Sequence, residues 1–189
     1  MEYVDPIRDI DKILAIKKYL RNQSSRDLLL FVLGINTGIR INDLLSLKVN
    51  DVWDGTGARE FLFINHEETT SSKKGYFYLN HQVKMALESY LSKYDLKETD
   101  YLFKSKKNEL SISRQQAYRI INHAAKEVGI CGKIGMHTLR KTFGYHAYRK
   151  GIAISILMGI YHHQTPAETL RYIGIDKNVE HLIKLDVNL

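Results

Sequence analysis

Residues that start and end helices recur along the whole 189-residue chain and divide it into short helical segments. Serine, threonine and asparagine cap free N–H groups at a helix start, and glycine adopts the left-handed conformation that ends many helices. Thr165-Pro166-Ala167-Glu168 combines a threonine cap, a proline at the first helical position and an acidic residue. These signals and the apolar spacing predict helices over residues 9–22, 26–37, 42–47, 81–94, 114–127, 138–150, 154–158, 166–172 and 178–185.

Strand-forming residues gather in the first half of the chain. Residues 60–64 and 76–79 are rich in aromatic and branched side chains, which predicts a hairpin whose loop is the polar stretch 65–75. Val52-Trp53 predicts a further short strand. We therefore predict one domain over residues 1–189, mainly helical with a small antiparallel β-sheet (an α+β fold), which is long enough for one core.

Charge and composition restrict the function. The chain has 28 basic and 21 acidic residues, a net charge of +7, which favours a polyanionic partner. No apolar run is long enough to span a membrane, and Met1 is not followed by a secretory signal, so we expect a cytoplasmic protein. The single cysteine, Cys131, excludes an internal disulfide, and no ligand spacing predicts a metal site.

Two arginines, two histidines and one tyrosine form a chemical set. Arg40 follows Thr37-Gly38-Ile39, His137 and Arg140 lie three residues apart and so share a helix face, and His163 and Tyr172 follow. The planar guanidinium of arginine binds two phosphate oxygens, a histidine transfers protons, and a tyrosine hydroxyl can attack phosphorus. The pattern predicts phosphoryl transfer to a tyrosine.

The set and its order resemble the catalytic domain of tyrosine recombinases, the phage-integrase family, over about residues 27–175. Residues 37–45, 135–144 and 169–174 carry the resemblance. It implies that Arg40 and Arg140 clamp the phosphate and that Asp43 orients the first arginine. It also places the second histidine nine residues before Tyr172, which selects His163; the neighbouring His162 fills a position usually held by glycine.

The family also places a lysine in the hairpin loop. Lys73 and Lys74 are the only lysines there, and we choose Lys73 first and Lys74 second. Tyrosine has an ordinary pKa of about 10 and needs a proton acceptor near pH 7. We expect His137 to be that base, His163 to donate a hydrogen bond to the phosphate, and the lysine to protonate the leaving 5′-oxygen.

The resemblance implies strand exchange on double-stranded DNA through a 3′-phosphotyrosyl bond, with neither ATP, metal nor cofactor. It also implies a homo-tetramer on DNA and a monomer or weak dimer when free, with the tail 176–189 docking on a neighbouring protomer. Most family members carry an N-terminal helical domain that completes a DNA clamp. Only one or two predicted helices precede Arg40, so we expect a form without that domain: a natural short form, the catalytic domain of a longer protein, or a protein that borrows a second DNA grip.

Two other functions remain open from the sequence. A type IB topoisomerase-like enzyme uses the same tyrosine chemistry and would relax supercoiled plasmid without a specific site. A non-catalytic DNA-binding paralogue would occupy sites and regulate, and Tyr172→Phe would leave its activity unchanged. The DNA site, the direction of the reaction among integration, excision, resolution and inversion, and cleavage in cis or in trans are not encoded in any recognisable pattern.

Overall fold

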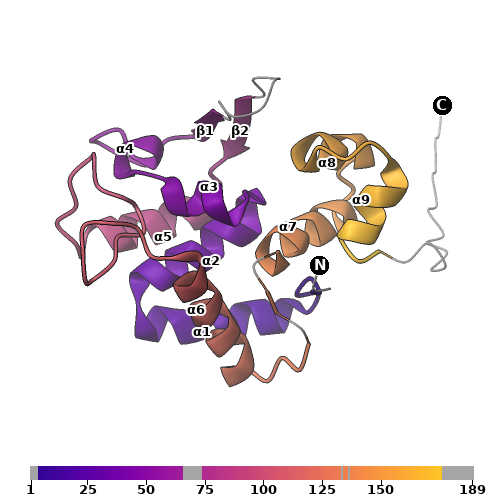
Figure 1. Cartoon of the computed structure of the whole chain (residues 1–189), viewed down its shortest axis with the longest axis horizontal. Coiled ribbons are helices and arrows are strands. Elements are labelled where there is room, and N and C mark those ends of the chain that lie inside the picture. The colour runs from indigo at the N-terminus through magenta and orange to yellow at the C-terminus, as the bar shows by residue number, and fades with distance from the viewer. Residues whose placement is uncertain (1–3, 66–73, 133, 136, 176–189) are drawn as a thin grey trace.

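The computed structural model of the protein describes residues 4–65, 74–132, 134–135 and 137–175 (Figure 1). Over these residues a two-stranded antiparallel sheet accompanies a set of helices, as predicted. The elements are α1 (Ile10–Gln23), α2 (Ser25–Thr37), α3 (Ile41–Ser46), α4 (Val49–Val52), β1 (Phe61–Asn65), β2 (Lys74–Tyr78), α5 (His81–Leu91), α6 (Arg114–Glu127), α7 (Thr138–Arg149), α8 (Ile154–Tyr161) and α9 (Pro166–Tyr172).

The predicted helix starts are confirmed by their capping side chains. Four side-chain oxygens each accept a hydrogen bond from the backbone N–H three residues further on: those of Ser24, Asn80, Ser113 and Thr165. Gly38 ends α2 with φ at 67°, the left-handed conformation that favours glycine. Local sequence therefore determines where these helices begin and where α2 ends.

The strand predicted at Val52-Trp53 is wrong. Val52 ends the short helix α4, in which Asp51 Oδ2 accepts a hydrogen bond from Lys48 N–H at 2.7 Å. Trp53 forms only an isolated bridge with Ala58. The carboxylate of Asp51 offers the backbone a local partner, and this short-range bond prevails over the strand preference of the two apolar residues.

Two helix ends also differ from the prediction. α5 ends at Leu91, three residues before the predicted Tyr94, and α8 extends to Tyr161, three residues beyond the predicted Met158. α8 is longer because Leu157 and Tyr161, one turn apart, are both buried in the same apolar cluster. Tertiary packing thus stabilises a turn that sequence periodicity leaves undecided.

The hairpin presents one face to the core and the other outward. Leu62 of β1 is fully buried, and its cross-strand partner Phe77 packs against the same core. The hairpin lies beside α3 and α4 in Figure 1.

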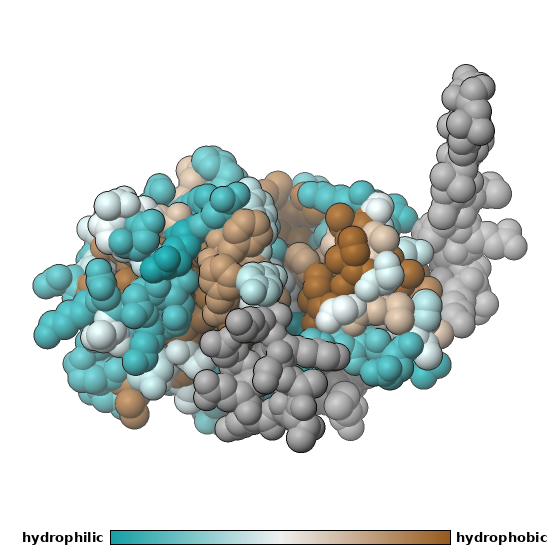
Figure 2. Space-filling view, turned by 90° about the horizontal axis from the view of Figure 1, so that it is seen from above, coloured by the Kyte–Doolittle hydropathy of each residue, from teal (hydrophilic) through white to brown (hydrophobic). Residues whose placement is uncertain are grey.

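The buried residues form two clusters. The larger joins α1, α2, α5, α6 and the hairpin, and the smaller joins α8 and α9 to the outer face of α7. In Figure 1 the smaller cluster forms the lobe on the right, and Figure 2 shows hydrophobic side chains gathered on the surface of that lobe. None of the described helices is long and apolar enough to cross a membrane.

Glycines let α2 and α7 approach each other closely. A Cβ atom on Gly34 would lie 2.6 Å from Leu139 Cδ1, and one on Gly38 would overlap the ring of Phe143. Carbon atoms prefer separations of about 3.5–4.0 Å, so neither position accepts a side chain without movement. This packing brings the end of α2, which leads into Arg40, against the first turns of α7, which carry Arg140.

Candidate active site

Arg140 is the best-fixed side chain of the site. It is only 7% exposed, and its guanidinium donates hydrogen bonds to the carbonyl oxygen of Gly38 and, at 2.8 Å, to that of Ile160. It also lies over the ring of Tyr161, 4.6 Å from the centroid. Two carbonyls and one aromatic face therefore hold this arginine between the end of α2 and the end of α8.

Burial also affects the ionisation of Arg140. It lowers the pKa of the guanidinium, whereas the charges of Tyr172, Tyr161 and Asp43 act in the opposite direction. The ordinary pKa of arginine is far above 7, so Arg140 keeps its charge.

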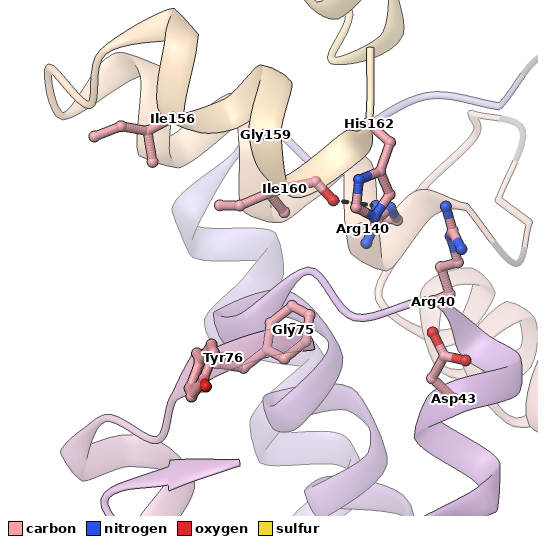
Figure 3. A pocket seen from close by; sticks show the side chains of 10 residues that line it. Arg40, Asp43, Gly75, Tyr76, Arg140, Ile156, Gly159, Ile160 and His162 are labelled. Carbon is pink, nitrogen blue, oxygen red and sulfur yellow. Dashed lines mark hydrogen bonds between the residues drawn. The ribbon is translucent and has the colours of Figure 1, made fainter. Parts of the chain in front are cut away.

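Arg40 precedes α3 and is exposed, as expected of a group that receives a ligand. Two cavities meet at Arg40 and Arg140, because both arginines line both of them. Figure 3 shows Arg40 reaching toward Arg140, with the Asp43 carboxylate below it on α3. The two guanidinium groups thus come from opposite sides of one opening, and the role of Asp43 in orienting Arg40 stays a prediction.

The first of these two cavities is the one lined by Tyr172, which ends α9. Its hydroxyl oxygen lies 3.4 Å from Nδ1 of His137, and its ring packs edge-on against His163 with centroids 5.1 Å apart. Arg40, Arg140, His137, His163 and Tyr172 all line this cavity. Five side chains that span more than 130 residues of sequence are therefore brought to one opening.

The proton equilibria of this cavity favour a neutral base beside a neutral tyrosine. Burial raises the pKa of Tyr172, although Arg140, by charge and hydrogen bonding, and the charge of Arg40 act against that rise. Burial lowers the pKa of His137, and the nearby charges of Arg114, Lys141 and Arg140 lower it further. His137 is therefore neutral at pH 7 and able to accept a proton from the hydroxyl beside it.

His163 is held by α9. Its side chain is 13% exposed, and its Nδ1 lies 3.1 Å from Thr169 Oγ1. Thr169 Oγ1 also lies 3.4 Å from the carbonyl oxygen of Thr165, to which it can donate, so the Nδ1–Oγ1 contact fits either tautomer of His163. Burial lowers the pKa of His163, while Glu168 raises it and Arg140 lowers it.

His162 occupies the other cavity. It has φ at 60°, the one non-glycine residue in the described part of the chain with positive φ, which suits a position usually held by glycine. It lines the second cavity together with Arg40 and Arg140 (Figure 3). The two adjacent histidines therefore face different openings, and only His163 faces the one that holds Tyr172.

Three further residues were missed by the sequence reasoning. Arg114, the first residue of α6, lines the Tyr172 cavity. Tyr161 supports Arg140 from below, and Lys141 Nζ lies 5.3 Å from the centroid of the Tyr172 ring. The Ser113 cap predicted a helix start but not that this start faces the cavity, and no local signal distinguishes Tyr161 from the other eleven tyrosines.

The lysine assignment is not decided by the structure. Lys73 lies outside the described residues, and Lys74 begins β2, where it pairs with Asn65. Gly75 and Tyr76, which follow it, line the second cavity beside Arg40 and Arg140. Among the described residues, no group of three or more His, Cys, Asp or Glu side chains is arranged to hold a metal ion.

Comparisons with known proteins assign this fold to a family. The chain belongs to the phage integrase family, whose model matches residues 7–179. It is 42% identical over 178 residues to the probable integrase/recombinase YoeC of Bacillus subtilis (strain 168), across 94% of this chain and 93% of that protein.

Longer relatives and solved structures agree with this membership. The chain is 27% identical to a tyrosine recombinase of Pseudothermotoga lettingae (strain ATCC BAA-301 / DSM 14385 / NBRC 107922 / TMO), over 88% of this chain but 54% of that protein. The crystal structure of XerA recombinase superposes with a TM-score of 0.74 at 23% identity, over 93% of this chain and 61% of that one. The fold is that of a tyrosine recombinase catalytic domain, and the chain spans about half the length of the longer relatives.

Proposed function

We propose that this protein cuts and rejoins double-stranded DNA at specific sites through a covalent bond between Tyr172 and a 3′-phosphate. The observation that carries the proposal is the Tyr172 hydroxyl, 3.4 Å from a neutral histidine in a cavity lined by two arginines. Membership of the phage integrase family supports the same function.

The proposed reaction assigns one role to each of these side chains. The Tyr172 oxygen attacks the phosphorus, its proton passes to His137, and the bond between phosphorus and the 5′-oxygen breaks. Negative charge grows on the non-bridging oxygens, where Arg40 and Arg140 donate hydrogen bonds. Because Arg140 is already held by two carbonyls, it needs no rearrangement when that charge develops.

The remaining roles complete the proposal. His163 donates a hydrogen bond to the phosphate, and Lys73, or otherwise Lys74, protonates the leaving 5′-oxygen. The covalent bond conserves the energy of the phosphodiester, so a second 5′-hydroxyl can reverse the step without ATP. The mechanism assigns no step to a metal ion or a cofactor, and we infer that the enzyme acts in the cytoplasm.

We also propose that the protein works as a homo-tetramer on DNA and is a monomer or weak dimer when free. The tail 176–189, which would dock on a neighbouring protomer, lies outside the described residues. Deleting residues 178–189 should weaken assembly on DNA, measured by gel shift and light scattering. An unchanged complex on DNA would argue against the docking tail.

Covalent trapping tests the proposed chemistry. The protein is incubated with nicked duplexes cut from the replicon that encodes it, with EDTA present and without ATP, and adducts that survive denaturant are counted. Adducts with wild type and none with Tyr172→Phe are expected, and sequencing them identifies the site. Retained DNA binding without adducts would instead favour the non-catalytic regulator, and site-independent relaxation of supercoiled plasmid would favour the topoisomerase-like enzyme.

A further inference from the structure

Lys141 is a buried cation to which the proposed reaction assigns no role. It follows Arg140 in α7, is 7% exposed, and donates a hydrogen bond from Nζ to the carbonyl oxygen of Val4 at 2.8 Å. Burying an ammonium is unfavourable unless polar groups hold it. Here the carbonyl belongs to a segment 137 residues away in sequence, so the site of this charge is built by the tertiary structure.

Lys141 and His137 hold Tyr172 from one helix face. They are four residues apart, which places both side chains on the same side of α7. Nδ1 of His137 lies 3.4 Å from the Tyr172 hydroxyl, and Nζ of Lys141 lies 5.3 Å from the centroid of the same ring. That distance is within the range of a cation–π contact. The histidine therefore meets the reactive end of the tyrosine and the lysine meets its ring.

We propose that Lys141 is a positioning residue for the transfer of the Tyr172 proton to His137. The inference rests on the proposed function, because it assigns Lys141 a role in the same step. The ammonium fixes the ring in the orientation that points the hydroxyl at Nδ1. Its charge also disfavours a protonated His137 before the reaction, so the base is free when DNA arrives.

Several charged and titratable groups face this proton transfer. Arg114 of α6 faces His137, together with Arg140 and Lys141 of α7, and burial and these charges all lower the pKa of the histidine. Asp5, which precedes α1, faces Lys141 and opposes the lowering of the lysine's pKa by burial.

Charged and aromatic groups from several parts of the chain surround Tyr172. Arg40 before α3 and Arg140 of α7 lower the pKa of Tyr172 against the effect of burial. The rings of Tyr161, at the end of α8, and His163 pack against it at centroid distances of 5.0 and 5.1 Å. Arg40 and Arg140 line the Tyr172 cavity, where they would bind the phosphate. Lys141 does not line that cavity, and its ammonium lies over the Tyr172 ring.

The N-terminal segment keeps Lys141 in place. Ile7 N–H donates a hydrogen bond at 2.9 Å to Oγ1 of Thr142, the residue after Lys141. Arg8 Nη2 donates one at 2.8 Å to the carbonyl oxygen of Gly174, which lies two residues after Tyr172. The segment from Val4 to Arg8 thus contacts both α7, which begins directly after His137, and the chain just after α9, which carries Tyr172. Its Val4 carbonyl accepts the hydrogen bond from Lys141, and its Arg8 side chain binds the backbone just after Tyr172.

The test separates the charge of Lys141 from its hydrogen bond. Lys141→Gln keeps a donor for the Val4 carbonyl and loses the charge, whereas Lys141→Arg keeps the charge. Lys126→Met is the matched control, because it removes one exposed positive charge at the far end of α6, about 18 Å along the helix from Arg114. Urea denaturation checks that each variant folds.

Two measurements are made on each variant. The first is the titration of His137 in the free protein by NMR, which needs no DNA and no catalysis. The second is the rate of covalent adduct formation between pH 5.5 and 8.5. For Lys141→Gln we expect the His137 titration to move to higher pH. We also expect cleavage to slow by up to about fourfold near pH 6, because a His137 pKa at or below its ordinary value of about 6.5 leaves at least roughly a quarter of the histidine neutral there. The difference narrows as the pH rises.

Each result decides between positioning and simple packing. Lys141→Arg should restore the wild-type titration and most of the rate, and Lys126→Met should change neither. An unmoved His137 titration in Lys141→Gln would overturn the proposal, as would a wild-type cleavage rate at every pH or unfolding of both Lys141 variants. If wild type forms no adduct, the proposed function fails, and the NMR titration still decides whether Lys141 acts on His137.

Discussion

A methyl group added at Gly144 should displace Tyr172 from its position in the cavity. Gly144 lies in α7, and a Cβ there would be 2.6 Å from Ile173 Cγ2, 2.9 Å from Tyr161 Cζ and nearer still to the Tyr161 hydroxyl. Carbon atoms in contact are about 3.5–4.0 Å apart, so Ile173 and Tyr161 must each move by roughly 1 Å in Gly144→Ala. Ile173 follows Tyr172 directly, so the nucleophile must move with it.

The size of the effect follows from these contacts. Overpacking of this kind costs about 1–3 kcal/mol. The hydrogen bond from the Tyr161 hydroxyl to the Arg140 carbonyl, 2.9 Å long, adds about 1 kcal/mol if it breaks. The higher helix propensity of alanine relative to glycine stabilises α7 by about 1 kcal/mol and offsets part of this loss. The free energy of unfolding should therefore fall by about 1–3 kcal/mol, or roughly 2–12 °C in Tm.

Gly144→Ala should lower the rate of DNA cleavage by a larger factor than its effect on the free energy of unfolding alone would suggest. A displacement of about 1 Å at the reacting group costs roughly 100-fold in rate, so Gly144→Ala should form adducts about 100-fold more slowly while still binding DNA. Single-turnover trapping on a nicked duplex measures the rate, and calorimetry measures Tm. Gly57→Ala is the control, because a Cβ at Gly57 meets nothing within 4 Å. A wild-type cleavage rate in Gly144→Ala would refute the argument that this contact positions Tyr172.

Other changes test the remaining parts of the site. Arg140→Lys cannot keep both carbonyl bonds and a phosphate fork, so trapping should slow by about 10²–10³-fold with DNA binding retained; a loss below fivefold would contradict the clamp. Because burial depresses the pKa of His137, protonation favours the unfolded state, so its contribution to stability is present above pH 6.5 and lost as pH falls. Urea unfolding of wild type and His137→Gln at pH 5 and 7.5 should show this, and equal pH slopes would count against it. Gly34→Ala places a Cβ 2.6 Å from Leu139 Cδ1 and should lower the unfolding free energy by about 1–3 kcal/mol, against no loss in Gly132→Ala.

Local chemistry made much of the secondary structure predictable. Caps such as Ser113 and the left-handed Gly38 act within three or four residues, so their effect can be read without the rest of the chain. The errors occurred where a distant or competing contact decides. Asp51 turned Val52 into a helix end, and burial of Tyr161 extended α8 beyond its predicted end.

The site shows the same division. Arg40, His137, Arg140, His163 and Tyr172 were predicted from residue type and from the resemblance to the phage-integrase family, and the structure brings all five to one cavity. Arg114 and Lys141 were missed, because an exposed arginine at a helix start and a lysine beside an arginine carry no local mark of function. Both lie near Tyr172 only because α6 and the N-terminal segment pack where they do.

The sequence by itself determined the class of fold, the helix starts and the chemical set, because capping, periodicity and residue type act over a few positions or through intrinsic reactivity. Only the tertiary structure decided how that set works. It placed His137 against the Tyr172 hydroxyl, fixed Arg140 between two carbonyls, and buried Lys141 beneath the N-terminal segment. These contacts join residues far apart in the chain, and their pKa shifts arise from burial and neighbouring charge, which exist only once the chain has folded.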